Sequence, residues 1–131
     1  MTGRRRVVYD TRFIAAMYSP KDDDEGQKVR REITTTLSRY LSSLTIYEVY
    51  KISLETEDKQ TADTRVELLK QDFTIVDVDW NLARQGAIIW KKYHIPMADA
   101  IIAATAMRLR AQCVTNDEHI SKIKEIKTRW V

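Results

Sequence analysis

The chain has 131 residues, of which 44% are hydrophobic and 31% are charged, with only three Gly and two Pro. This composition is typical of a single helix-rich globular domain over residues 1–131 and excludes a disordered chain. A formal net charge of +3 only weakly indicates a polyanionic partner. No apolar run approaches the roughly 20 residues of a membrane span, and the first ten residues do not form a secretory signal, so we expect a cytoplasmic protein with no membrane partner.

The first third of the chain predicts one strand and two helices. The run RVVYD predicts a strand that ends at Asp10, and TRFIAAMY predicts a helix directly after it. A longer helix is expected over residues 19–41, with Ser19 as its N-cap and Pro20 at its first position. The predicted apolar stripe of this helix consists of Val29, Ile33, Leu37 and Tyr40 or Leu41.

The rest of the chain continues the alternation of helices and strands. Helices are expected from Thr45 in SSLTIYEVYKISLE and over residues 59–72, followed by a buried strand in FTIVDV. Residues 79–94 predict a helix capped by Asp79, and IPMADAIIAATAM, residues 95–107, predicts a helix that is apolar all round and therefore buried. QCVTN predicts a third strand, DEHISKI a short helical turn and KTRWV a closing strand.

The predicted strands are apolar runs without strict alternation, a pattern typical of parallel strands covered on both faces. The expected fold class is therefore α/β, with a central parallel sheet flanked by helices in a three-layer α/β/α sandwich. The chain contains no repeat, low-complexity segment or evident linker.

Acidic residues fall at the expected carboxyl edge of this sheet, where open parallel sheets have their binding sites. Asp10 ends the first strand, Asp117 follows the third, and Asp99 lies in the first turn of a helix. Asp99 is the only charged residue in its apolar segment. The helix dipole stabilises an acid there by roughly 0.3–1 kcal/mol, which is small against the cost of burying an ionised carboxylate. A divalent cation shared with other acids would remove that cost.

Helix capping remains an alternative explanation for three of the acids. Asp10 has the position of an ordinary cap. Glu48 completes a capping-box pattern with Thr45, and Asp117 lies in another such pattern, TNDE.

Four segments, VVYDT, LTIYE, IPMADAIIAATA and VTNDEH, resemble the acidic signatures of PIN domains, and most closely those of the small VapC toxins. The resemblance runs from Val7 to Ile120. It implies a PIN-like fold and an endoribonuclease that depends on Mg²⁺ or Mn²⁺. It further implies a homodimer that acts on RNA and is neutralised by a cognate antitoxin. The metal-binding and catalytic residues that it implies are Asp10, Glu48, Asp99 and Asp117, with Thr11 and Thr115 as supporting polar residues.

The sequence departs from the family pattern at two positions. Arg12 stands where the family often has a small polar residue, and Ile120 stands where it often has Phe. Neither change removes an acid. Arg12 has two interpretations, a phosphate contact or a solvent-facing helix residue.

The residue types agree with the chemistry that the resemblance implies. Mg²⁺ prefers hard oxygen ligands, whereas one Cys and two His provide no cysteine-based or imidazole-rich site. We expect Asp10 and Asp99 to be the principal ligands and Asp117 to hold a second ion or to act through water. Glu48 would orient or deprotonate the attacking water.

The sequence does not fit two other classes of protein that place an Asp at the end of a strand. A phosphotransfer receiver needs an acidic pair, and a dehalogenase-type phosphatase needs Asp-x-Asp, but the sequence after the first strand is DTR. A catalytically inert PIN-like module that binds RNA or a protein stays open as the alternative. The basic run Arg4 to Arg6 has two equal interpretations. It contacts RNA phosphates, or it is a solvent-exposed segment that leads into the first strand.

We predict that apolar residues between positions 19 and 71 form dimer and antitoxin surfaces, namely Tyr40, Tyr47, Tyr50, Val66 and Leu69.

Overall fold

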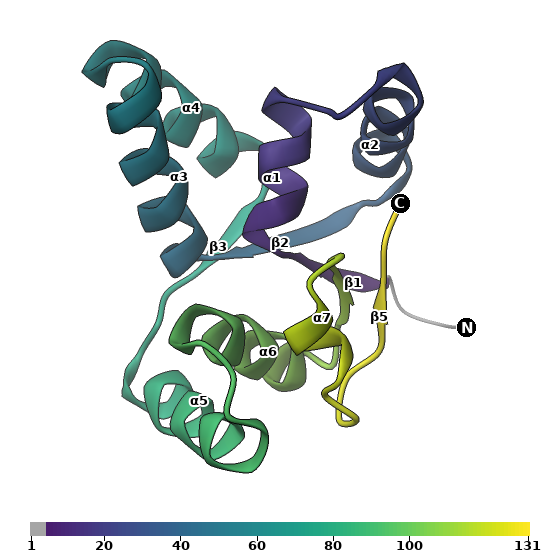
Figure 1. Ribbon diagram of the computed structural model, residues 1–131, viewed down its shortest axis with the longest axis vertical. Coiled ribbons are helices and arrows are strands. Elements are labelled where there is room, and N and C mark those ends of the chain that lie inside the picture. Colours follow the sequence, from purple (N-terminus) through teal and green to yellow (C-terminus); the bar gives the residue numbers. More distant parts are fainter. Residues whose placement is uncertain (1–4) are drawn as a thin grey trace.

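A five-stranded parallel sheet runs through the centre of the computed structural model, which describes residues 5–131 (Figure 1). The strand order is β3-β2-β1-β4-β5, and each neighbouring pair is parallel. The strands are β1 Arg6–Tyr9, β2 Ser38–Ser42, β3 Thr74–Val76, β4 Gln112–Val114 and β5 Thr128–Arg129. The predicted parallel sheet is therefore confirmed, with β1 at its centre.

Helices cover both faces of the sheet and complete the predicted three layers (Figure 1). One face carries α1 Thr11–Tyr18, α2 Asp23–Thr35, α3 Ser43–Thr56 and α4 Lys59–Asp72, and the other carries α5 Trp80–Tyr93 and α6 Met97–Leu109. The short α7, Glu118–Ser121, follows β4. Side chains of β1 alternate between the two cores, because Val7 and Tyr9 pack among α1 to α4 while Val8 packs with Ile102 of α6.

Several local predictions hold in the structure. The side chain of Asp79 caps α5 by accepting a hydrogen bond from the Leu82 N–H at 2.9 Å. Pro96 immediately precedes α6, which places Asp99 in its first turn. The middle of α6, from Ala100 to Ala106, is buried throughout, as its apolar sequence predicts.

The long helix predicted over residues 19–41 is wrong at both ends. Its N-cap is Asp22, whose side chain accepts from the Glu25 N–H at 2.8 Å, and not Ser19. The helix ends at Thr35, and residues 38–42 form β2 beside β1. Arg39 closes the helix end by donating to the carbonyl oxygens of Ile33 and Thr36. An apolar stripe read from sequence cannot reveal this pairing with β1, and Leu37, expected in the stripe, is 70% exposed.

The helix predicted from Thr45 also begins earlier. Ser42 caps α3 by accepting from the Leu44 N–H at 3.1 Å, so α3 starts at Ser43 and Thr45 lies inside it. The proposed capping box between Thr45 and Glu48 therefore does not form, and the side chain of Glu48 remains available for other contacts.

A buried ion pair ties α2 to the last strand. Both Glu32 carboxylate oxygens accept from the Arg129 guanidinium, at 2.8 and 2.9 Å. The hydroxyl groups of Tyr9 and Thr36 donate to the same carboxylate, and these contacts lower the pKa of Glu32 despite its burial.

Over the described part of the chain, no helix combines the length and apolar character that crossing a bilayer requires.

Candidate functional site

Two of the predicted acids lie just beyond the carboxyl ends of the central strand, β1, and its neighbour, β4. Asp10 directly follows β1, and Asp117 lies three residues after β4. The chain passes from β1 to β2 on one side and places β4 on the other, so this edge is the topological switch point of the sheet. Ligands bind at such points in open parallel sheets. The first turn of α6 brings Asp99 to the same edge, and α3 brings Glu48.

Thr115 holds two of the acids in place. Its hydroxyl donates to Asp10 Oδ2 at 2.7 Å and accepts from the Asp117 N–H at 2.9 Å. Asp10, Thr115 and Asp117 are all at least 95% buried. Since the Thr115 hydroxyl has one proton and uses it on Asp10, this network fixes the Asp10 carboxylate next to Asp117.

The capping alternative is wrong for Asp10 and right for Asp117. Asp10 has the N-cap position of α1, but its side chain makes no capping hydrogen bond. Asp117 Oδ1 accepts from the N–H groups of His119 and Ile120 at 2.7 and 3.3 Å, which caps α7. The second oxygen of Asp117 takes no part in the cap, so capping and a role in the site are compatible.

Glu48 faces the start of α1. The Thr11 hydroxyl donates to Glu48 Oε1 at 2.6 Å and lies 3.2 Å from the Thr45 hydroxyl oxygen. Thr11 thereby orients the carboxylate of Glu48 between α1 and α3.

Negative charge accumulates at this edge. Burial raises the pKa of Asp99 to about 6, and the charges of Asp117, Asp10 and Glu48 add to the rise. The side chain of Asp99 is 14% exposed. Burial also raises the pKa of Asp10, with a further contribution from Asp117 and an opposing one from the Thr115 hydrogen bond. That all three other acids act on Asp99 shows that the four carboxylates lie near one another.

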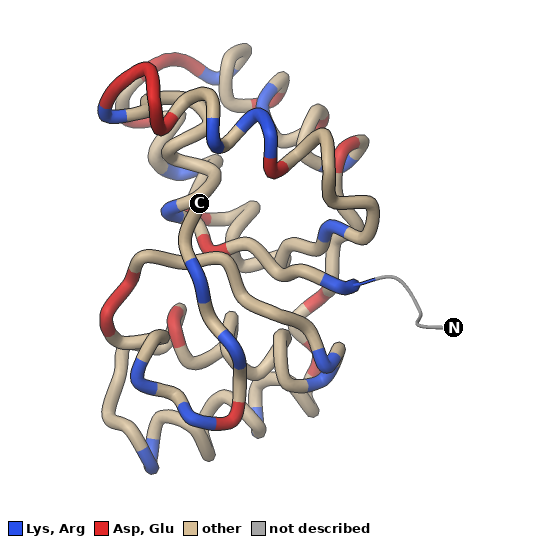
Figure 2. The backbone as a smooth tube through the Cα atoms, turned by 90° about the vertical axis from the view of Figure 1, so that its right-hand side faces the viewer, with Lys and Arg blue, Asp and Glu red and all other residues tan. Residues whose placement is uncertain are grey.

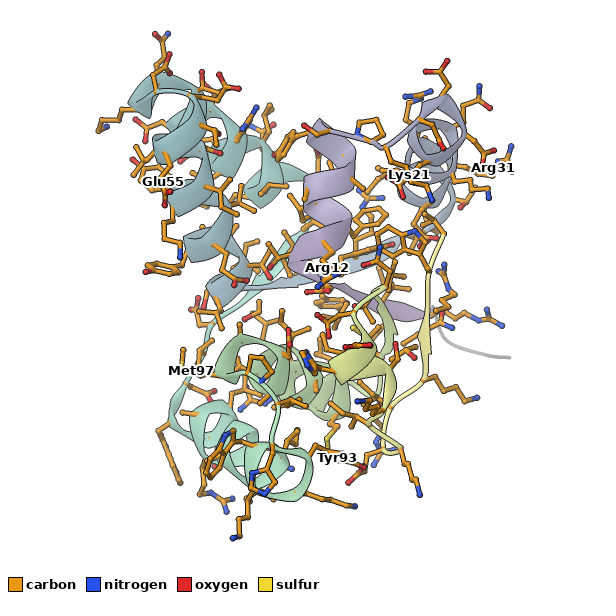
Figure 3. All side chains as sticks on the ribbon, viewed as in Figure 1. Arg12, Lys21, Arg31, Glu55, Tyr93 and Met97 are labelled. Carbon is orange, nitrogen blue, oxygen red and sulfur yellow. The ribbon has the colours of Figure 1, made fainter. Side chains whose placement is uncertain are left out.

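Arg12 faces solvent, as one of its two interpretations expects, and its guanidinium also reaches the acidic cluster. Its guanidinium lies 3.1 Å from Asp117 Oδ2, and Figure 3 shows it at the start of α1, on the side of α7. The side chain of Arg12 is 58% exposed. It is therefore a partly exposed counter-ion for a buried carboxylate.

His119 is the residue that the sequence analysis missed. Its Nδ1 lies 3.4 Å from Asp99 Oδ2 and 3.3 Å from Asp117 Oδ1. The sequence contains one signal for it, the Asp-x-His spacing just after a strand, although two histidines in the whole chain argue against an imidazole-rich site. Within residues 5–131, Asp99, Asp117 and His119 offer ligand atoms that all lie within 4.8 Å of one another.

The residues present fit a divalent cation. Three buried or half-buried carboxylates supply hard oxygen ligands of the kind Mg²⁺ and Mn²⁺ take in proteins. Burial and the neighbouring acids raise the pKa of Asp99, and a bound cation would favour its ionised form.

Other charged features lie outside the cluster. The acidic run after Pro20 places Asp23, Asp24 and Glu25 in the first turn of α2, where the helix dipole favours acids. Of the basic run at the N-terminus, Arg4 lies outside the described residues, and Arg6 donates to the carbonyl oxygen of Leu109.

Comparison with known proteins gives one family and several similar folds. The family model of the PIN domain matches residues 7–126, and no curated protein sequence matches the chain. A VapBC complex of Rickettsia felis bound to promoter DNA is 14% identical over 95% of this chain and 98% of that chain, with a TM-score of 0.77. The FitAcB structure of Neisseria gonorrhoeae is 23% identical over 93% and 95%, with a TM-score of 0.73. A Mycobacterium tuberculosis VapC toxin that cleaves the sarcin-ricin loop is 18% identical over 92% and 98%, with a TM-score of 0.73.

Proposed function

The chain belongs to the PIN domain family, and from this we propose that it is a metal-dependent endoribonuclease, the toxin of a VapBC-type pair. The observation that carries the proposal is the convergence of four carboxylates, whose charges raise the pKa of Asp99 to about 6 in addition to the effect of burial. A solely structural role does not explain four acids at one sheet edge, because their mutual repulsion opposes folding.

Each acid has a role that follows from its surroundings. We assign Asp10 and Asp99 as the principal ligands of Mg²⁺ or Mn²⁺ and Asp117 as a ligand that binds directly or through water. When bound, such an ion lowers the pKa of water and neutralises charge on the phosphate. Glu48, held by the Thr11 hydroxyl at 2.6 Å, accepts a proton from the attacking water. Thr115 keeps Asp10 in its ligating orientation.

Exposed basic residues on the surface favour a polyanionic substrate. Lys and Arg recur along the segment after α7 (Figure 2), where Lys122, Lys124 and Lys127 are exposed. Phosphate contacts of this kind give affinity without sequence specificity. Membership of the PIN family and the likeness to a toxin that cleaves the sarcin-ricin loop support single-stranded RNA as the proposed substrate class, with the cytoplasm as the proposed place of action.

Cleavage of single-stranded RNA by the purified protein tests the proposal. We expect cleavage with Mn²⁺ or Mg²⁺ that stops when chelator is added, and Asp99→Asn should abolish it. Asp24→Asn is the matched control, because Asp24 is 74% exposed and lies on α2, away from the cluster. Cleavage that persists in chelator, or in Asp99→Asn, would contradict the proposal. RNA binding without any cleavage would favour the inert module instead.

We also propose that residues 1–131 act as one domain that forms a homodimer and binds an antitoxin. Tyr47 is 60% exposed, and further large apolar side chains are exposed at Ile52 and Leu54 of the same helix. Leu69, predicted for this surface, is instead in the core at 1% exposure, and Tyr40 lies in β2. Light scattering at tens of micromolar tests the dimer, and a monomeric mass would contradict it.

A further inference from the structure

The ring of His119 places a buried nitrogen beside two carboxylates without hydrogen bonding to either of them. Its Nδ1 is buried and has no hydrogen-bond partner among residues 5–131, although 40% of the side chain is exposed. A buried nitrogen without a partner costs free energy comparable to a lost hydrogen bond. Because part of the ring is exposed, burial of the imidazole as a whole does not explain why Nδ1 faces the two carboxylates.

Two carboxylate oxygens flank this nitrogen at nearly equal distances. Nδ1 lies 3.4 Å from Asp99 Oδ2 and 3.3 Å from Asp117 Oδ1. Adjacent ligands of an octahedral ion with bonds of about 2.1 Å lie about 3.0 Å apart. Ligand atoms of Asp99, Asp117 and His119 all lie within 4.8 Å of one another, so His119 Nδ1 lies close enough to both carboxylates to share one ion with them.

The backbone around His119 is fixed independently of its ring. Its N–H donates to Asp117 Oδ1 at 2.7 Å, and Asp117 caps the helix that carries it. The Asp117 carboxylate thus fixes the backbone of His119 and also lies next to its Nδ1. Hydrogen bonds that orient a ligand in this way are typical of the surroundings of metal centres.

We propose that His119 Nδ1 is a direct ligand of the cation, which makes this a mixed nitrogen and oxygen site that favours Mn²⁺ over Mg²⁺. This inference rests on the proposed function for the presence of a cation. Mg²⁺ takes oxygen ligands and gives up its water reluctantly, whereas imidazole is a good ligand for transition-metal ions. The nitrogen ligand therefore adds affinity for Mn²⁺ and little for Mg²⁺.

Pulsed electron paramagnetic resonance on Mn²⁺ bound to the full chain tests the ligand directly, because a coordinated ¹⁴N modulates the electron spin echo. The chain offers a matched control, since His94 is the only other histidine. His94 ends α5 in a left-handed conformation with φ of 52°, which Asn tolerates. We expect nitrogen modulation in the wild type and in His94→Asn, and none in His119→Ala.

Calorimetric titration of the same three proteins gives a second readout. His119→Ala should weaken Mn²⁺ binding by about tenfold or more and change Mg²⁺ binding by less than about threefold. Bound Mn²⁺ without nitrogen modulation in the wild type would overturn the inference and leave the proposed function standing. Equal loss of both ions in His119→Ala would also overturn it. If neither ion binds, both the inference and the proposed function fail.

Discussion

Neutralising Asp99 should stabilise the protein in the absence of metal. Burial and the charges of Asp117, Asp10 and Glu48 raise the pKa of Asp99 from 3.8 to about 6. At 1.36 kcal/mol per pKa unit, this rise corresponds to about 3 kcal/mol of unfavourable free energy for the ionised form. Asn has nearly the same shape and no charge, so Asp99→Asn removes this penalty.

The sign of the pH dependence follows from linkage. The folded state holds the Asp99 proton more tightly than the unfolded state does, so this contribution is fully present below about pH 4 and is lost as pH rises through about 6. The advantage of Asp99→Asn should therefore be absent at pH 3.5 and near its full size at pH 7.5. For a chain of this size, about 3 kcal/mol raises the melting temperature by roughly 10 °C.

Thermal melts in chelator at both pH values measure this effect, with Asp24→Asn as the control for a general charge change. Adding Mn²⁺ should raise the melting temperature of the wild type more than that of Asp99→Asn, because an ion that binds only the folded state stabilises it. An Asp99→Asn variant that melts at or below the wild type in chelator at pH 7.5 would refute the reasoning. Burial and the neighbouring carboxylates would then not destabilise the ionised form of Asp99 by the expected amount.

The remaining predictions concern residues around and beyond the site. Glu32→Gln should lower the free energy of unfolding in urea by about 2–4 kcal/mol, because Arg129 loses its buried partner; a loss below about 0.5 kcal/mol would show that the pair contributes little. Gly86→Leu should destabilise by about 1–3 kcal/mol through overpacking, because even a Cβ there would lie 3.1 Å from a side-chain carbon of α6; an unchanged urea midpoint would contradict this close contact. Arg12→Gln should tighten Mn²⁺ binding about two- to fivefold in calorimetry, because the exposed guanidinium competes with the cation for Asp117. Weaker binding would mean that Arg12 supports the site and does not compete.

Local sequence patterns determined those features that depend on a few neighbouring residues. The Asp79 cap, the acids in the first turn of α2 and the buried apolar α6 all follow from contacts within one or two helical turns. The position of the acids at strand ends and helix starts also follows from sequence, because parallel strands carry their carboxyl ends to one edge. The acids of the candidate site were found by this route and by the PIN resemblance.

Tertiary structure decided what depends on residues far apart in the chain. Residues 38–42 continue a helical stripe in the sequence, but they form a strand between β1 and β3, because pairing on both sides satisfies their backbone groups. The side chains of Arg12 and His119 joined the cluster because α1 and α7 both meet Asp117. The hydrophobic periodicity of a sequence shows which face of a helix or strand a residue occupies. Which other element packs against that face depends on the tertiary structure. For His119, this packing decides whether the imidazole is a surface group or a candidate metal ligand.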